Sequence, residues 1–389
     1  FTLLSSPFAQ FGFTGVQVFN IFVAIATAWF GYRILKMLEV NNAFLYPIFL
    51  VFSPVYTIMA YSGMTEVLFG FFSVFFAYLF LRKKYMLSAS FYSFVPLVRT
   101  EGIILLPLYA LGLLLKRKYK ALPFFLLGFI VYSIIGYFYY HDFFWLITKM
   151  PYGTDSPYGT GSLTYYFEKY AKYLGVPLTP LILIGIIVVI VNIIHKKQNA
   201  YEIAFLILLP ALTYFFAHVI MWWSGVGNSN GSIRYMVAIM PLTSIFAIMG
   251  LNVFLTFIKR VFSNSSVRFV VLIPLLIFII NEPFRHYKIP TGYYGNQKYV
   301  HEASEWLKES GHLEKKFYYW YPDFEIMLDF NPFNKKIVKQ GLNNYEIPHK
   351  NIDKGSIIIY DKAFAPTMIP FNKLKSSPHF KVIKTFGVH

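Results

Sequence analysis

The amino-acid sequence predicts an α-helical polytopic membrane protein with a small C-terminal α/β domain. Of its 389 residues, 57% are hydrophobic and only 14% are charged, a balance typical of membrane proteins. The apolar residues gather in long runs that are suited to membrane helices. After residue 280 these runs become short and alternate with charged residues, as in a soluble domain. We therefore expect a membrane domain over residues 1–280 and an α/β domain over residues 281–389.

About ten apolar segments are expected in the membrane domain, after an interfacial loop at Phe1–Phe13. Two of them, Met86–Val98 and Ile103–Leu115, are short, and each would span about 20 Å as a helix. Since a hydrocarbon core is about 30 Å thick, we expect these two arms to form a hairpin that enters and leaves on one side. The other segments cover residues 14–37, 42–60, 67–81, 121–139, 177–194, 201–222, 236–258 and 269–280.

Lysine and arginine are distributed unequally between the two sides of this predicted arrangement. With strict alternation, fourteen fall on one side, in the loops around 33–36, 82–84, 116–120, 196–197 and 259–268, and five fall on the other. The positive-inside rule makes the first side cytoplasmic. The polar stretches 62–66, 99–101, 141–175 and 224–234 then share the outer face, together with everything after residue 280.

The expected C-terminal domain contains one helix and three strands. Asn296–Ser310 has apolar residues at helical spacing and is followed by Gly311. Lys316–Trp320, Ser356–Tyr360 and Lys381–Phe386 are expected to be strands.

Composition also excludes several classes of function. The net charge of +17 is explained by loop topology, so a nucleic-acid partner is not expected. The chain has no cysteine, which removes thiolate chemistry and disulfides. No nucleotide-binding glycine loop and no G-x-S-x-G motif occur.

A charged pair and a single carboxylate are expected at the outer face. Arg99 and Glu101 lie between the two short arms, at membrane depth, where a charge is costly and by default functional. They could form a mutual ion pair that closes the hairpin, or Arg99 could bind a phosphate with its planar fork. Glu66 follows Thr65 at the start of a span. Its negative charge could simply stabilise the start of the helix, where the helix dipole favours an anion and Ser62 or Thr65 would be the cap. Alternatively, its carboxylate could line an outer cavity.

A glycine-containing loop that ends in Ser232-Ile233-Arg234-Tyr235 provides a second candidate anion site. Loop amides, a helix start and an arginine together suit an anion. Arg234 could instead be a simple loop charge, and the preceding Trp222-Trp223 pair could be an interfacial belt.

The outer loop 141–175 holds further candidates. Asp155 and Asp142 could act as an acid, a base or a metal ligand, although turn and cap roles are commoner for such residues. Tyr158, Tyr165 and Tyr166 could stack on a sugar ring or mark the membrane interface. His141 and His218 have no metal-ligand partner at useful spacing, so we expect both to be structural and expect no metal cluster.

Several of these motifs resemble the GT-C superfamily of integral-membrane glycosyltransferases. Residues 98–107 (VRTEGIILLP) are similar to the family's R-P-E-G…L-P pattern, with Thr100 where many relatives have proline. Thr65-Glu66 opens a span, and residues 231–241 are similar to the R-Y…P start of a late span. The loop 158–162 (YGTGS) looks like one in bacterial mannosyltransferase-like members.

The resemblance implies an inverting enzyme that moves a sugar, for example mannose, from a polyprenyl-phosphate donor. The acceptor would be a glycan, a lipid or a protein, and the enzyme would act in the bacterial inner membrane with its active face and C-terminus in the periplasm. A divalent cation such as Mg²⁺ or Mn²⁺ is left open as a cofactor. A rival function is a lipid or glycolipid transporter or flippase, and a third is a non-catalytic scaffold in a cell-envelope complex.

The resemblance also implies roles for particular residues. The family's catalytic Asp or Glu lies in the first outer loop, so it is expected upstream of Phe1, in a chain with one more span. The donor phosphate would be bound by Arg99, Arg234, Ser232 and Tyr235, and Glu66 and Glu101 would support them. The substrate loop would contain Asp155, Tyr158, Gly159 and Gly161.

Overall fold

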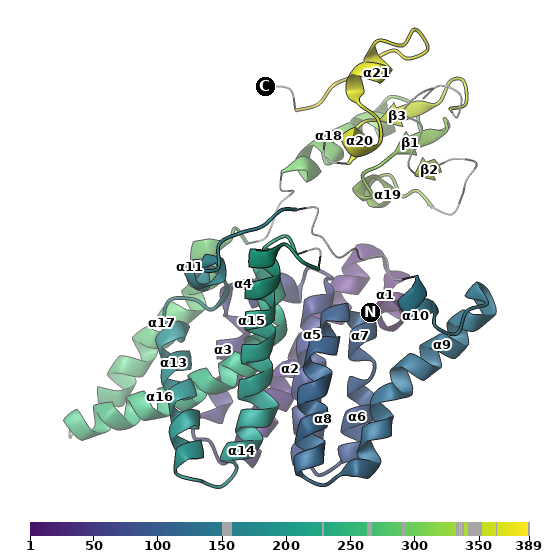
Figure 1. Ribbon diagram of the computed structural model, residues 1–389. Coiled ribbons are helices and arrows are strands. Elements are labelled where there is room, and N and C mark those ends of the chain that lie inside the picture. Colours follow the sequence, from purple (N-terminus) through teal and green to yellow (C-terminus); the bar gives the residue numbers. More distant parts are fainter. Residues whose placement is uncertain are drawn as a thin grey trace. The chain divides into compact units, whose positions relative to one another are not determined.

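The computed structural model describes residues 1–149, 158–227, 229–262, 267–289, 293, 295–331, 334, 336, 338–340, 352–362 and 364–387. The chain divides into two compact units, Phe1–Lys288 and Ile289–His389, which we call unit 1 and unit 2. Helices dominate unit 1 (Figure 1).

The first half of unit 1 begins with a helix that the sequence did not predict. Residues Thr2–Ala9 form α1, so the expectation of a loop at 1–13 is wrong. The hydroxyls of Ser5 and Ser6 bond back to the carbonyls of Thr2 and Leu3, which satisfies them inside the helix. The following helices are α2 (Gly12–Met37), η1 (Ala43–Leu45), α3 (Tyr46–Val51), α4 (Pro54–Ala60), α5 (Thr65–Leu81), α6 (Tyr85–Tyr92), α7 (Val95–Val98), η2 (Thr100–Leu105) and α8 (Leu106–Leu115).

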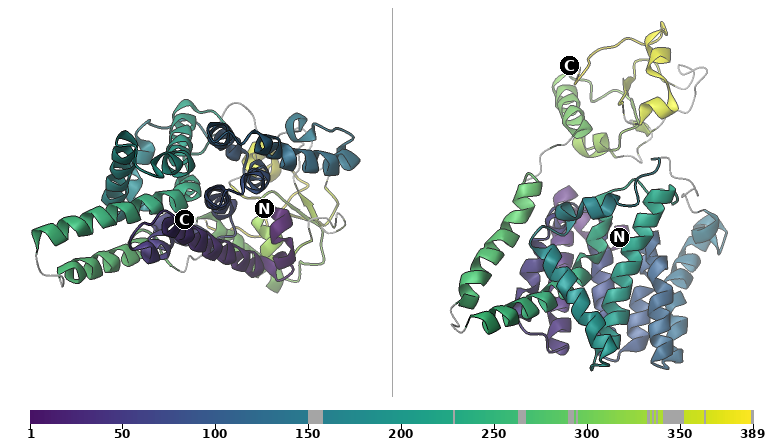
Figure 2. Two further views of the ribbon diagram at one scale, coloured as in Figure 1. Left: turned by 90° about the horizontal axis from the view of Figure 1, so that it is seen from below. Right: turned by 60° about the vertical axis from the view of Figure 1, so that its left-hand side comes forward.

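The second half of unit 1 continues with short 3-10 and π segments between the long helices. Its elements are η3 (Tyr119–Leu126), α9 (Leu127–Tyr140), α10 (Trp145–Thr148), α11 (Tyr165–Glu168), α12 (Tyr170–Tyr173), α13 (Leu178–Ile194), α14 (Ala200–Ile203), η4 (Ala204–Leu208), α15 (Leu209–Ser224), η5 (Ile233–Ile239), α16 (Met240–Val261) and α17 (Val267–His286). In Figures 1 and 2, α16 and α17 extend from one side of the bundle, and α9 and α10 lie at the other.

Unit 1 has the long apolar helices of a helical membrane protein. Within the described residues, five helical stretches are long and apolar enough to cross a membrane: 12–37, 119–140, 200–224, 233–261 and 269–286. A sixth would be the pair Ala43–Val51 and Pro54–Ala60, which bends by 76°. Proline at the start of α4 explains this break, because proline has no N–H to donate into a continuous helix. The count of ten membrane segments stays a prediction.

The two short arms around Arg99 form consecutive helices that break at this residue. Tyr85–Val98 and Thr100–Leu115 are apolar but shorter than a full span. Arg99 itself has an extended backbone, with φ −149° and ψ 131°, between α7 and η2. The chain therefore interrupts its helix where the predicted charges lie.

Helices α13 and α16 are in close contact because glycine occurs at their crossing. A Cβ added at Gly185 would lie 2.0 Å from the carbonyl oxygen of Phe246. One added at Gly250 would lie 1.9 Å from the carbonyl oxygen of Leu181. Small residues that let helix backbones approach are a usual means of helix association in membranes.

Unit 2 contains a three-stranded parallel sheet in the order β2-β1-β3. Its elements are α18 (Asn296–Glu309), β1 (Phe317–Tyr319), α19 (Asp323–Met327), β2 (Val338–Gln340), β3 (Ile357–Ile359), α20 (Ala365–Met368) and α21 (Phe371–Lys375). The predicted helix and the first two predicted strands coincide with α18, β1 and β3. The strand predicted at 381–386 is wrong, because these residues are extended without a strand partner, and β2 was not predicted.

Candidate functional site

Three segments far apart in the sequence meet at one buried carboxylate. Glu66 lies in the first turn of α5, where the helix dipole favours an anion. Its Oε1 accepts a hydrogen bond of 2.7 Å from Nη1 of Arg99. Nη2 of Arg99 donates to Oε1 of Glu101, also at 2.7 Å. Of the two roles open for Arg99 and Glu101, the mutual ion pair is therefore present.

Arg234 reaches the same carboxylate from the start of η5. Its Nε lies 3.3 Å from Oε1 of Glu66. Its guanidinium also lies over the Tyr235 ring, 5.7 Å from the ring centroid, and that of Arg99 lies 5.2 Å from it. Within the described residues, Nε of Arg234 has no hydrogen-bond partner, so its contact with Glu66 is an ion pair without a hydrogen bond.

Burial differs sharply among these charged groups. The Glu66 side chain is 1% exposed and that of Arg99 12%, whereas that of Arg234 is 35% exposed. A buried ion is tolerated only with close partners, and Glu66 has two. We call Glu66, Arg99, Glu101 and Arg234 the charged cluster. Arg234 is its most exposed member and so has the most access to a ligand.

The predicted cap of α5 is wrong in detail. The N-cap residue is Met64, which makes no side-chain cap, and Ser62 instead accepts the Met64 N–H at 3.3 Å. The Thr65 hydroxyl accepts from Nη1 of Arg99 at 3.2 Å. Asn20 on α2 donates to the Met64 carbonyl at 2.9 Å, which fixes the entry to the helix. The start of α5 is therefore shaped around Arg99.

Aromatic side chains of α15 support the Tyr235 ring. His218 stacks on Tyr235, with ring centroids 4.8 Å apart and an interplanar angle of 19°. Tyr214 lies 4.6 Å from the His218 ring. Within the described residues, neither ring nitrogen of His218 has a hydrogen-bond partner. His218 thus contributes by stacking, in keeping with the structural role predicted for it.

Trp222, also on α15, joins two outer loops. A Cβ at Gly161 would lie 1.8 Å from the Trp222 indole nitrogen, and one at Gly231 would lie 2.6 Å from the indole ring. The Gly161 N–H also donates to the Trp222 carbonyl at 3.0 Å. Only Trp223, which is strongly exposed, fits the predicted interfacial belt. Trp222 therefore holds the predicted substrate loop beside the loop that carries Arg234.

The other predicted site residues lie as follows. The Ser232 carbonyl accepts from the Tyr166 hydroxyl at 3.4 Å, and the Tyr235 hydroxyl donates to Asn230 at 2.9 Å. Tyr158 is exposed. Gly159 has a positive φ of 78°, which favours glycine. Asp155 lies outside the described residues.

Asp142 stabilises the turn that precedes α10. Its Oδ1 accepts the Phe144 N–H at 2.8 Å, and its Oδ2 accepts the Thr148 hydroxyl. These hydrogen bonds hold the pKa of the Asp142 carboxyl below its usual range, because they stabilise the charged form. The turn role is therefore present for Asp142, whereas the N-cap of α10 is Phe144 and has no side-chain cap.

Sequence reasoning missed Tyr214, Trp222 and Asn20 as parts of this site. A periodic signal was available for the first two, because Tyr214, His218 and Trp222 are spaced four residues apart and so share one face of a helix. For Asn20 no local signal exists, since its partner Met64 is distant in the chain.

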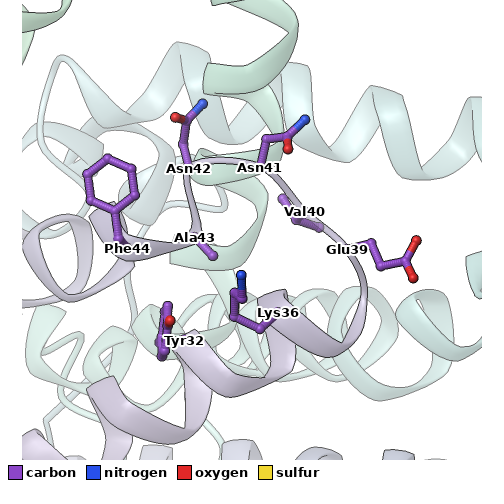
Figure 3. Close-up of a pocket in the computed structure, with 8 residues that line it drawn as sticks. All are labelled: Tyr32, Lys36, Glu39, Val40, Asn41, Asn42, Ala43 and Phe44. Carbon is purple, nitrogen blue, oxygen red and sulfur yellow. The ribbon is translucent and has the colours of Figure 1, made fainter.

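A separate pocket lies near the C-terminal end of α2. It has a volume of about 450 Å³, and Tyr32, Lys36, Glu39, Asn41 and Asn42 contribute to its lining (Figure 3). It contains none of the predicted site residues. Among the described residues, no group of three or more His, Asp and Glu side chains could bind a metal ion.

Neither the scan against protein-family models nor the search of curated proteins gives a match to this chain.

Proposed function

We propose that this protein is a membrane glycosyltransferase of the GT-C type that uses a polyprenyl-phosphate sugar as donor. The observation that carries the proposal is the convergence of Arg99 and Arg234 on the buried Glu66. A lipid-phosphate leaving group needs cationic hydrogen-bond donors close to a membrane, where a charge without a function is costly.

The two arginines have different roles in this proposal. Both Nη groups of Arg99 are engaged, by Glu66 and Glu101, so Arg99 orders the cluster and fixes Glu66. Glu66 in turn pairs with Arg234 at its Nε, and among the described residues neither Nη group of Arg234 pairs with a carboxylate. A guanidinium held this way can donate two parallel bonds to one phosphate. Arg234 is therefore the phosphate-binding residue.

The chemical step is a displacement with inversion at the anomeric carbon. The acceptor oxygen forms a bond to this carbon, the bond from the carbon to the phosphate oxygen breaks, and the lipid phosphate leaves with the electron pair. A carboxylate base takes the acceptor proton. We do not give this role to Glu66 or Glu101, because one carboxylate oxygen of each already accepts a hydrogen bond from Arg99.

The proposal extends to location. The loops on the side of the membrane opposite the charged cluster have the excess of lysine and arginine, so by the positive-inside rule the cluster is extracytoplasmic. In a bacterial inner membrane this is the periplasmic face, where a polyprenyl-phosphate sugar would enter from the lipid and meet a glycan, lipid or protein acceptor.

A transfer assay with purified protein tests the proposal. Wild-type protein should move a radiolabelled sugar from a polyprenyl-phosphate donor to an acceptor fraction from the cell envelope. Arg234→Ala should reduce the rate by about 100-fold or more, since electrostatic groups of this type contribute that much. Arg234→Lys should retain part of it, because lysine keeps the charge and loses the fork.

Arg33→Ala is the matched control. Arg33 lies on α2 and contacts Trp29, away from the charged cluster, so transfer should stay at the wild-type rate. Sugar transfer that is unchanged in Arg234→Ala and in Arg99→Ala would refute the proposal.

A further inference from the structure

The last part of unit 2 has a charge unlike that of the rest of the unit. Residues 289–361 contain nine lysines and ten acidic residues, which nearly balance. Residues 362–387 contain five lysines and no aspartate or glutamate. We call residues 362–387 the basic segment. It is yellow in Figures 1 and 2.

All five lysines of the basic segment are exposed: Lys362, Lys373, Lys375, Lys381 and Lys384. Among the described residues, Lys362, Lys375, Lys381 and Lys384 form no ion pair. The lysines elsewhere in the unit include three that do, Lys298, Lys308 and Lys316. The positive charge of the segment is therefore largely uncompensated.

Large apolar side chains are exposed among these lysines. Phe364 is 49% exposed, Phe371 43%, Val382 53% and Ile383 56%. The neighbouring Ile369 and Leu374 are buried with Trp320, so the same segment also has a packed side. Exposed aromatic and aliphatic groups between unpaired lysines match the interface of an anionic bilayer, where the apolar groups enter and the lysines bind headgroups.

The extended end of the segment is fixed on both sides. Phe380 packs against the cluster of Trp320, Ile369 and Leu374. Phe386 packs on α18, with its ring 6.0 Å from that of Trp306. Lys381, Val382, Ile383 and Lys384 lie between these anchors and are all exposed. These two basic and two apolar side chains are therefore exposed in a segment that is anchored at both ends by Phe380 and Phe386.

We propose that the basic segment is a membrane-docking surface for anionic phospholipid headgroups. Only residues 287–295 separate α17, a candidate membrane helix, from α18, so unit 2 is tethered beside a bilayer. Docking would keep unit 2 at the lipid surface. The inference does not depend on the sugar-transfer activity.

Single-cysteine labelling of the full chain tests the docking, because the protein has no cysteine of its own. Val382→Cys, with Ile383→Cys as a second position, is labelled with a fluorophore and reconstituted in nanodiscs that contain doxyl-labelled lipid. In discs with phosphatidylglycerol the doxyl groups should quench the fluorophore. In discs of phosphatidylcholine alone, or at high salt, the quenching should fall by about half or more, because the attraction is electrostatic.

Two further variants complete the design. Replacement of Lys373, Lys375, Lys381 and Lys384 by glutamine should abolish the dependence on phosphatidylglycerol. Ile326→Cys is the matched control, since Ile326 is as exposed as Val382 but lies on α19, in the part of unit 2 with balanced charge. Its label should not be quenched.

Three outcomes would overturn the inference. In the first, doxyl-labelled lipid does not quench the labels at 382 and 383. In the second, it quenches the label at 326 as strongly as those at 382 and 383. In the third, the labels at 382 and 383 are shielded from aqueous iodide but are not quenched by lipid. The last outcome would mean that protein covers the segment.

Discussion

At the scale of single residues, Glu66 determines the arrangement of the charged cluster. Its side chain is 1% exposed, and its carboxylate pairs with both Arg99 and Arg234. Burial of such a group costs several kcal/mol, which only close cationic partners offset. Removal of the carboxylate charge leaves the positive charges of Arg99 and Arg234 without the negative partner that they share in the folded protein.

Glu66→Gln is therefore expected to lower the free energy of unfolding by about 3 kcal/mol, the usual effect of breaking a buried pair. Glu101→Gln should cost less, because Glu101 is more exposed and, among the described residues, forms an ion pair with Arg99 only. Thermal unfolding in detergent measures both. Equal melting temperatures of wild-type protein and Glu66→Gln would show that the pairing is not formed.

Tyr235 supplies two separable contributions. Its ring lies beside both guanidiniums and the His218 ring, and its hydroxyl donates to Asn230. Tyr235→Phe removes only the hydrogen bond, at a cost of about 1 kcal/mol.

Tyr235→Leu also removes the ring contacts, so its loss of stability should exceed that of Tyr235→Phe by about 1 kcal/mol or more. Chemical unfolding of the two variants decides this point. Equal losses would mean that the ring contacts contribute nothing.

At the scale of elements, the crossing of α13 and α16 depends on the absence of side chains at Gly185 and Gly250. Each would place a Cβ about 2 Å from a backbone carbonyl oxygen of the partner helix. Backbone cannot move aside as a flexible side chain can. The two helices must separate if either glycine is replaced.

Gly185→Ala and Gly250→Ala are expected to destabilise unit 1 by about 1–3 kcal/mol each, the usual cost of overpacking. Gly112→Ala on α8 is the control, because the nearest atom to its added Cβ is 3.9 Å away. Fluorescence-detected size-exclusion chromatography after heating ranks the three variants. A heat stability of Gly185→Ala equal to that of Gly112→Ala would argue against the close crossing.

In unit 1, hydrophobic patterning predicted where the helices lie in the sequence better than it predicted how they bend. Apolar runs located the spans, because burial in lipid requires them irrespective of tertiary contacts. They could not show the bend between α3 and α4, since an apolar run is equally apolar when bent at Pro54. They also missed α1, which was predicted as part of a loop; the hydroxyls of Ser5 and Ser6 bond within this helix.

The charged cluster was predictable in its members but not in its pairing. Charge at membrane depth marked Arg99, Glu101, Glu66 and Arg234, because such groups need a reason to be there. That Glu66 would bind two arginines, and that Arg99 would use both Nη groups on carboxylates, depends on long-range packing of α5 against η5 and α7. In unit 2 the short strand β2 carries no alternating pattern that would have revealed it.

At the scale of the whole molecule, the distribution of basic residues predicts an orientation. The loop between α13 and α14 contains Lys196 and Lys197 and should be cytoplasmic, whereas unit 2 should be outside. Because the chain lacks cysteine, one introduced cysteine reports one position.

Leu313→Cys in unit 2 should react with a membrane-impermeant maleimide in intact spheroplasts. Lys197→Cys should react only after permeabilisation. The reverse pattern would place the charged cluster on the cytoplasmic side and would contradict the proposed location.

In the proposed site, Arg234, which pairs with the buried Glu66, binds a lipid phosphate. Direct binding of polyprenyl monophosphate to the purified protein tests it without the need for an acceptor. Loss of a charge-assisted pair costs about 1.5–3 kcal/mol, so Arg234→Gln should raise Kd by roughly 10- to 100-fold. Arg33→Gln, outside the cluster, should leave Kd unchanged. A Kd for Arg234→Gln equal to that of the wild-type protein would contradict the account.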